Sequence, residues 1–215
     1  MNFACEAVLT NFSNLSYKSH MKNKNIEIGK DVILGHNVKI EDNVKILGNC
    51  LIADHVVITS GSRLTDVVVG EDTKIDNSII EQANIDKNCK IGPFAHIRPT
   101  CCIAENVKIG AFVELKNAIV GKGSKIPHLS YVGDAEIGEN CNIGCGVVFA
   151  NYDGKKKQKS KLGNNVFVGC NVNIVAPVNI ASDTYICAGT TVTNDTKQGD
   201  FVIGRVRQEN KTRDQ

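Results

Sequence analysis

One histidine of the sequence, His128, lies in a setting that suggests chemistry. It belongs to the stretch KIPHLSYVGDAEIG (residues 125–138), in which Ser130 and Tyr131 follow it closely. Imidazole is the side chain that changes its charge nearest to neutral pH, so histidine is the most frequent proton acceptor in catalysis. Taken alone, a histidine is more often a surface residue, and a catalytic interpretation therefore depends on its neighbours.

Cationic side chains gather at other places in the sequence. Arg98 and Lys116 precede His128, the polar stretch ANYDGKKKQKS (150–160) carries Lys155, Lys156, Lys157 and Lys159, and the C-terminal stretch carries Arg205, Arg207, Lys211 and Arg213. A planar guanidinium suits bidentate phosphate binding, and a lysine adds a point charge. A solvated loop and a frayed terminus are the simpler interpretations of the last two stretches. Their combination with Arg98, Lys116 and Tyr131 favours a functional role.

The elements that must position these residues follow a six-residue repeat. Aliphatic anchors recur at this spacing from Ile28 to Val192, with a small or β-branched residue two positions before most of them and often a glycine directly after. No amphipathic α-helix has this period. The repeat instead predicts short parallel strands whose inward side chains share one interior, with three hexads closing one triangular coil and roughly nine coils in all.

The repeat also predicts how the chain is organised. We expect an all-β fold, a parallel β-helix over residues 26–195, with an irregular N-terminal segment over 1–25 and a basic C-terminal tail over 196–215. Phe149 and Leu162 are thirteen residues apart where twelve would keep the register, which predicts an extruded loop near 150–160. Glycines at the corners are expected because tight turns often need positive φ.

Composition excludes several classes of protein. The 215 residues are 42% hydrophobic but only 5% aromatic, and the net charge is +2, so the core must be aliphatic and a broad nucleic-acid-binding face is not expected. The first residues lack the features of a signal peptide or membrane span, which predicts a cytoplasmic location.

The cysteines and histidines indicate neither disulfides nor a metal site. The nine cysteines include no CxxC motif, and Cys50, Cys89, Cys101 and Cys141 fall on inward positions of the repeat, so we interpret them as apolar fillers. The five histidines lack the spacing of a zinc site, and no metal is expected to be required.

Between about Ile91 and Lys211 the sequence resembles a known family. The motifs IGPFAHIRP, FVELKNAIVGKGSKIPHLSYVGDAEIG, NIGCG, NYDG, VFVGC, VAPV, AGTTVT and RVRQENK occur in this order. They are similar to the acetyltransferase half of the bifunctional N-acetylglucosamine-1-phosphate uridyltransferase/glucosamine-1-phosphate N-acetyltransferase, in the hexapeptide-repeat acyltransferase superfamily. The resemblance implies a left-handed β-helix, a homotrimer with active sites between neighbouring prisms, and acetyl transfer from acetyl-CoA to the amine of glucosamine 1-phosphate.

The resemblance further implies roles for individual residues. His128 would be the general base that takes a proton from the attacking amine. The sugar phosphate and sugar would contact Arg98, Lys116, Tyr131, Asn142, Asn151, Tyr152 and Lys157. The backbone of Cys145 would stabilise the oxyanion, and the coenzyme A site would also include Cys170, Ala188, Arg205 and Lys211. For the group that orients the second ring nitrogen of His128, Glu114 is a suggestion.

Some positions depart from the family pattern. Cys145 and Cys170 stand where the family commonly has a small serine or alanine, and Arg207 stands where it has a proline. A backbone role survives such a change, whereas a hydroxyl role at position 170 would be weakened. No glycine-rich nucleotide motif precedes the hexads, so we expect no uridyltransferase activity in this chain and leave open a separate uridyltransferase as partner. Two alternative functions remain: acetyl transfer to a different amino sugar or nucleotide sugar, and a non-catalytic assembly subunit.

Overall fold

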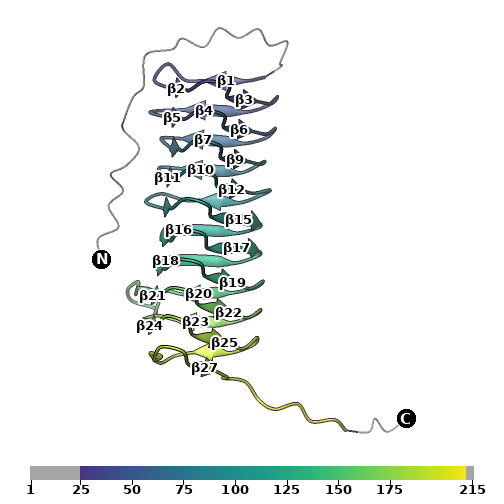
Figure 1. Cartoon of the computed structure of the whole chain (residues 1–215), viewed down its shortest axis with the longest axis vertical. Helices are drawn as coiled ribbons and strands as arrows, with labels where there is room; N and C mark the ends of the chain where they lie inside the picture. Colours follow the sequence, from purple (N-terminus) through teal and green to yellow (C-terminus); the bar gives the residue numbers. More distant parts are fainter. Residues whose placement is uncertain (1–24, 212–215) are drawn as a thin grey trace.

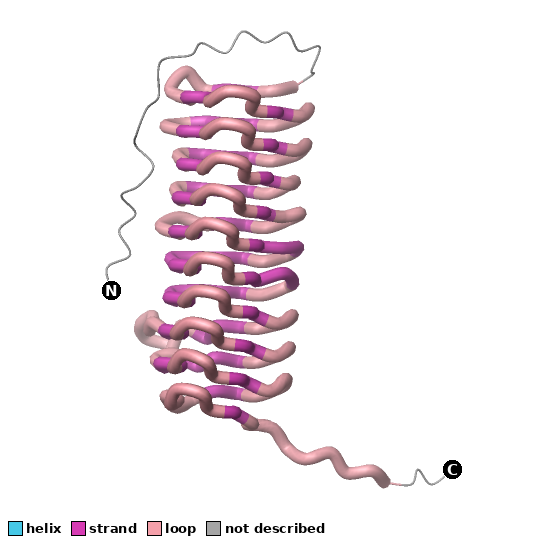
Figure 2. Tube along the Cα trace, viewed as in Figure 1, coloured by secondary structure: helices cyan, strands magenta, loops and turns pink. Residues whose placement is uncertain are grey.

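Each hexad of the sequence forms a short strand followed by a turn, and the strands stack in parallel along one axis (Figure 1). The computed structural model describes residues 25–211, so the expectations for residues 1–24 and for Arg213 lie outside the described residues. Within 25–211 the secondary structure consists of strands and turns without a helix (Figure 2). The predicted all-β class and the left-handed parallel β-helix are confirmed.

The strands form three faces of a prism. The first face contains β1 (Glu27–Ile28), β4 (Lys45–Leu47), β7 (Arg63–Thr65), β10 (Ile79–Glu81), β13 (His96–Ile97), the first half of β16 (Glu114–Val120), the first half of β18 (Tyr131–Ile137), β20 (Val148–Ala150), β23 (Asn173–Val175) and β26 (Thr191–Val192). The second face contains β2 (Ile33–Leu34), β5 (Leu51–Ile52), β8 (Val68–Val69), β11 (Asn84–Ile85), β14 (Cys102–Ile103), the second halves of β16 and β18, β21 (Ser160–Leu162) and β24 (Val178–Ile180).

The third face is a sheet of ten strands, so the prism has about one coil more than the nine predicted. Its strands are β3 (Lys39–Ile40), β6 (Val57–Ile58), β9 (Lys74–Ile75), β12 (Lys90–Ile91), β15 (Lys108–Ala111), β17 (Lys125–His128), β19 (Asn142–Ile143), β22 (Phe167–Val168), β25 (Tyr185–Ile186) and β27 (Phe201–Val202). The last of these pairs with β25, so parallel pairing continues beyond Asp195 into the expected tail.

The core consists of the predicted anchors and the residues two positions before them. Anchors such as Ile46 and Ile58 are fully buried, and so are the preceding Val44 and Val56. The four cysteines interpreted as fillers are buried in the same cluster. Burial raises the pKa of the Cys89 thiol to about 12, so this group stays protonated and behaves as an apolar side chain.

Most glycines after the anchors serve a different purpose from the one predicted, although Gly92 has the predicted positive φ. The corners with positive φ are formed mainly by asparagine and aspartate, among them Asn37 and Asp72, whose short polar side chains tolerate this conformation. Gly110, in contrast, lies where the next coil approaches, and a Cβ atom there would be 1.8 Å from the carbonyl oxygen of Pro127. These glycines therefore allow adjacent coils to pack closely.

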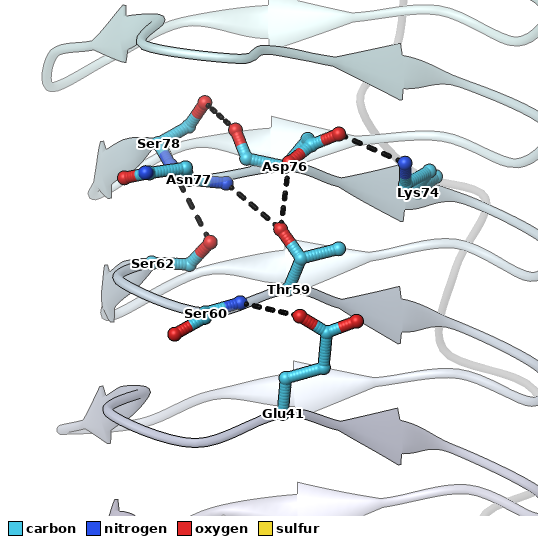
Figure 3. Close-up of polar contacts among 8 residues, drawn as sticks. All are labelled: Glu41, Thr59, Ser60, Ser62, Lys74, Asp76, Asn77 and Ser78. Carbon is cyan, nitrogen blue, oxygen red and sulfur yellow. Dashed lines mark hydrogen bonds and ion pairs between the residues drawn. The ribbon is translucent and has the colours of Figure 1, made fainter.

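Polar side chains on the surface of the early coils bond to one another between coils (Figure 3). The Thr59 hydroxyl donates to Asp76 over 2.7 Å, and Glu41 accepts from the amide of Ser60 over 2.9 Å. The predicted loop near 150–160 separates β20 from β21 and projects from the stack (Figure 1).

Candidate active site

Arg98 and Lys116 lie side by side on the first face. The Arg98 amide donates to the carbonyl of Leu115 over 2.9 Å, which places the two cationic residues on successive coils. In the next coil Lys116 pairs with Gly133. A Cβ atom at Gly133 would lie 2.5 Å from the Tyr131 hydroxyl and 2.6 Å from Nδ2 of Asn151. The absent side chain thus lets the Tyr131 phenol and the Asn151 amide lie close against the backbone, beside two cations.

Glu114 contacts Arg98 rather than His128. The Arg98 guanidinium donates to Oε1 of Glu114 over 2.8 Å, and this hydrogen bond raises the pKa of Arg98. The suggestion that Glu114 orients His128 is therefore wrong for this chain, because register places Glu114 on the first face next to Tyr131, whereas His128 ends β17 on the third. The carboxylate instead fixes the guanidinium.

Asp134 is the buried anionic centre of this region, and sequence reasoning did not single it out. It is 9% exposed and accepts hydrogen bonds from Nδ2 of Asn117, over 2.6 Å, and from Nδ2 of Asn151. Burial by itself would raise the pKa of Asp134, but the two amide donors and the charges of Lys116 and Lys157 outweigh burial and lower it. The carboxylate stays ionised and holds Asn151 in place. The only signal for it was its position in the motif HLSYVGDAEIG.

The extruded loop brings Lys157 to the same region. An antiparallel bridge between Tyr152 and Lys157 closes the loop, and Oδ1 of Asp153 accepts from the amides of Lys155 and Lys156 over 2.8 Å each. These donors lower the pKa of Asp153 to about 2.

Lys157 itself is placed against another cation. The nearby Lys116 lowers the pKa of Lys157, an effect that Asp134 opposes. Tyr152 is exposed, and its hydroxyl donates to the carbonyl of Gly154 over 2.8 Å. The structure therefore brings together Arg98, Lys116, Tyr131, Asn151 and Lys157 on one side of the prism, with Tyr152 on the loop that carries Lys157.

His128 lies at the corner between the third and first faces. It pairs with Ala111 of the preceding coil and is exposed, and within residues 25–211 its ring has no hydrogen-bond partner. Its carbonyl accepts from the hydroxyl of the buried Ser130 over 2.7 Å, and the same hydroxyl is 3.2 Å from the carbonyl of Gly144. The backbone at His128 is thereby fixed while the ring faces solvent.

The other predicted residues lie elsewhere on the prism. Asn142 is on the third face, where β19 pairs with β17 and β22, so one chain does not bring it to Arg98 and Lys116. Cys145, Cys170 and Ala188 form one corner column, since Asn171 donates to the carbonyl of Cys145 and Gly189 to that of Cys170, each over 2.8 Å.

The C-terminal residues begin beside this corner column. A Cβ atom at Gly189 would lie 3.5 Å from Cδ of Arg205, which places Arg205 next to Ala188. Lys211 is exposed, and its Nζ is 3.6 Å from Glu209. The corner column and Arg205 thus form a continuous strip along the later coils.

Comparisons with known proteins agree with this architecture. The model of the bacterial transferase hexapeptide (six repeats) matches residues 31–66, and that of the GMPPB C-terminal domain matches residues 79–153. Bifunctional protein GlmU of Acetivibrio thermocellus is 48% identical over 152 residues, which are 71% of this chain and 33% of the relative. GlmU of Listeria monocytogenes is 48% identical over 161 residues, 75% of this chain and 35% of the relative.

The chain belongs to the hexapeptide-repeat proteins and is a homologue of GlmU. It spans about a third of the length of these GlmU relatives. A solved structure of the Arabidopsis UDP-N-acetylglucosamine acyltransferase is 17% identical to this chain and superimposes with a TM-score of 0.52. The match covers 81% of this chain and 68% of the Arabidopsis chain, which shows a shared fold.

The described part of this GlmU homologue lacks two features, a metal-binding cluster and a membrane-spanning helix. Residues 25–211 include no cluster of three or more His, Cys, Asp or Glu side chains arranged to hold a metal ion. The same residues include no helix with the length and hydrophobicity needed to span a bilayer.

Proposed function

We propose that this chain is an acetyltransferase that transfers an acetyl group from acetyl-CoA to the amine of glucosamine 1-phosphate. The observation that carries the proposal is the cationic group on one side of the prism, where Arg98, Lys116 and the loop residue Lys157 lie beside Tyr131 and Asn151. Its support is the 48% identity to GlmU over 152 residues.

The cationic residues would bind the phosphate of the acceptor. Arg98 presents a guanidinium fixed by Glu114, with donors suited to a phosphate. Lys116 and Lys157 are close enough for one to lower the pKa of the other, and an anion between them would relieve this repulsion. Tyr131, Asn151 and Tyr152 would then contact the sugar hydroxyls.

His128 would act as the general base. The neutral amine attacks the thioester carbonyl, its N–C bond forms, and His128 takes the amine proton. The C–S bond then breaks, and coenzyme A leaves as its thiol after taking a proton. Holding amine and thioester together makes a covalent acyl-enzyme unnecessary.

The acetyl-CoA would lie along the corner column of Cys145, Cys170 and Ala188, with Arg205 and Lys211 as cations for its phosphates. The Cys145 amide has no hydrogen-bond acceptor among residues 25–211, so it is free to donate to the developing oxyanion. The scheme uses only side chains, backbone amides and the two substrates.

We further propose a homotrimer. Asn142 lies on the third face and Arg98 on the first, so a pocket that contains both is completed by a neighbouring prism. Light scattering on active enzyme should give three times the chain mass. A fully active monomer would contradict the shared site.

The compartment would be a reducing one. The eight cysteines among the described residues form no disulfide, which agrees with a cytoplasmic enzyme.

The test is thiol release from acetyl-CoA with a panel of amino-sugar acceptors. The proposal expects the highest kcat/KM with glucosamine 1-phosphate. Faster turnover of a nucleotide-linked or different amino sugar would identify that compound as the acceptor. Absence of turnover with every acceptor would contradict the proposal and favour a non-catalytic assembly subunit.

A further inference from the structure

The coil that contains β1, β2 and β3 forms one end of the described stack (Figure 1). Its strands pair with the second coil, β1 with β4 and β2 with β5. Within residues 25–211 no strand pairs with the opposite edge of β1 or β2. We call this end of the prism the open end.

The backbone at the open end presents hydrogen-bond acceptors without a coil above them. The carbonyl of Val44 in the second coil accepts from the amide of Glu27 over 3.0 Å. The carbonyl of Ile26 has the same position one coil earlier, and that of Ile28 follows it, but no described strand lies above them to donate. Strand edges of this kind pair with other chains unless they are covered.

The interior of the prism is also less covered at the open end. In the second coil the inward side chains of Val44 and Val56 are fully buried. One coil earlier several inward side chains are only partly buried, namely Ile26, Ile28, Val32 and Val38. Apolar surface that a further coil would bury therefore remains accessible, and repeat proteins need a capping element at such ends.

The proposed trimer would leave the open end uncovered. Prisms that share a site between their faces lie side by side, so they bury faces of one another and not ends. A cover must come from a segment that joins the prism at this end or from a molecule that stacks onto it.

Residues 1–24 lead directly into the open end, because Asn25 lies just before β1. Their sequence does not add another coil. The six-residue register would place Lys22, Ser16 and Thr10 at the inward anchor positions, which aliphatic side chains occupy in the described coils.

The apolar residues of this segment have a different spacing. They recur in the first fifteen residues at the spacing of one face of a helix, namely Cys5, Val8, Leu9, Phe12 and Leu15. The stretch SYKSHMKNK (16–24) that follows is mostly polar. Its nine residues span up to about 30 Å when extended, whereas the six residues of one prism face span about 20 Å. The polar stretch is therefore long enough for the apolar one to turn back across the open end.

We propose that residues 4–15 lie as an amphipathic helix across the open end and cap the interior of the prism. A helix of this length is about 18 Å long, close to the length of one face. Leu9 and Phe12 would contact the partly buried side chains of the first coil, and Thr10 and Asn14 would face solvent. A segment joined to the rim acts at a high effective concentration, which favours it over a second molecule recruited from solution.

The first experiment uses the full chain, whose sequence contains no tryptophan, so one substitution gives a single fluorescent reporter. Phe12→Trp should emit at shorter wavelength than the control Asn14→Trp, because the indole at position 12 would be removed from water. Adding Val38→Lys at the open end should reverse this shift. Adding Val202→Lys, which changes a partly buried valine of the last coil, should not.

The second experiment compares two variants of equal net charge. Leu9→Asp with Phe12→Asp should lower the Tm by about 5 °C or more relative to Thr10→Asp with Asn14→Asp, because only the first pair places charges against the interior. Circular dichroism verifies that every variant keeps the β-helix.

Three results would overturn the proposal: equal emission from the reporters at positions 12 and 14, no response of the first reporter to Val38→Lys, and equal Tm of the two charge variants. Light scattering that gives twice the mass of the trimer, with reporter emission that changes on dilution, would overturn it in favour of two assemblies stacked end to end.

Discussion

The coils from β1 to β10 and the coils from β13 to β20 share one interior and differ in their outward side chains. In the early coils polar side chains pair with each other, Thr59 through a hydrogen bond to Asp76 and Lys45 through an ion pair with Glu27. In the later coils Lys116 and Lys157 lie together beside Asn151 and Asp134, and the exposed His128 has no partner among the described residues. The difference teaches that the inward hexad positions build the scaffold, while outward positions are free to carry chemistry.

The largest effect that separates the two regions is expected at the histidines. His128→Ala should lower kcat by about 10²- to 10⁴-fold, because a general base is removed from the transition state. The control is His55→Ala in the early coils, which should leave kcat unchanged. Steady-state thiol release measures both. If the His128 variant keeps more than about a tenth of the activity, the residue shapes the pocket without taking the proton.

The two regions should respond alike when the core is changed. Ile58 and Ile143 are both fully buried, so Ile58→Ala and Ile143→Ala should each lower the free energy of unfolding by about 2–5 kcal/mol through lost burial and a residual cavity. Urea denaturation of the two variants gives the comparison. A much smaller cost at Ile143 would show that the later coils pack less tightly than the burial indicates.

Two arginines of the first face offer a third comparison. Arg98→Ala should lower kcat/KM for glucosamine 1-phosphate about 30-fold or more, because a charge-assisted phosphate contact is lost. Arg63→Ala, two coils earlier on the same face, should have little effect. With unphosphorylated glucosamine the Arg98 loss should shrink. Equal losses for both acceptors would assign Arg98 a structural role.

The smallest effect concerns acid stability. Because the pKa of Asp134 is lowered in the folded chain, its ionised form adds stability above the unfolded value of about 3.9, and this is lost as pH falls through the folded pKa. Below about pH 4 the wild type should therefore lose more stability than Asp134→Asn. Thermal unfolding between about pH 3 and pH 6 at fixed ionic strength measures this. If the stability of the two proteins falls in parallel as the pH decreases, Asp134 does not make the expected contribution.

The core could be predicted from the sequence because a six-residue period admits few structures. Val44 and Ile46 are buried because they occupy the two inward positions of one hexad, as the repeat predicts. The strand Phe201–Val202 was missed because Val202 follows the anchor Val192 by ten residues, and the intervening turn hides the period. The corner residues were predicted wrongly because asparagine and aspartate also tolerate positive φ. Most glycines after the anchors are needed instead where adjacent coils approach each other closely.

The candidate site was predicted through resemblance and only in part through physics. Spacing alone does not reveal that Lys157 reaches Lys116, because the loop leaves the repeat and returns by a bridge to Tyr152. Asp134 gave no signal beyond its place in the motif HLSYVGDAEIG, since an aspartate at a turn is ordinarily solvated, and its role depends on Asn117 and Asn151 from neighbouring coils.

The close approach at Gly110 has a consequence for how such a chain can change its length during evolution. Paired positions follow one another at 18 residues from Lys45 to Arg63 (63 − 45) and at 16 from Arg63 to Ile79 (79 − 63), so only the corners absorb single insertions. An insertion within a face would turn inward side chains outward and press a Cβ atom into the next backbone. Gain or loss of sequence is thus tolerated as whole coils or as loops between strands, and the lysine-bearing loop before β21 has the form of one such insertion.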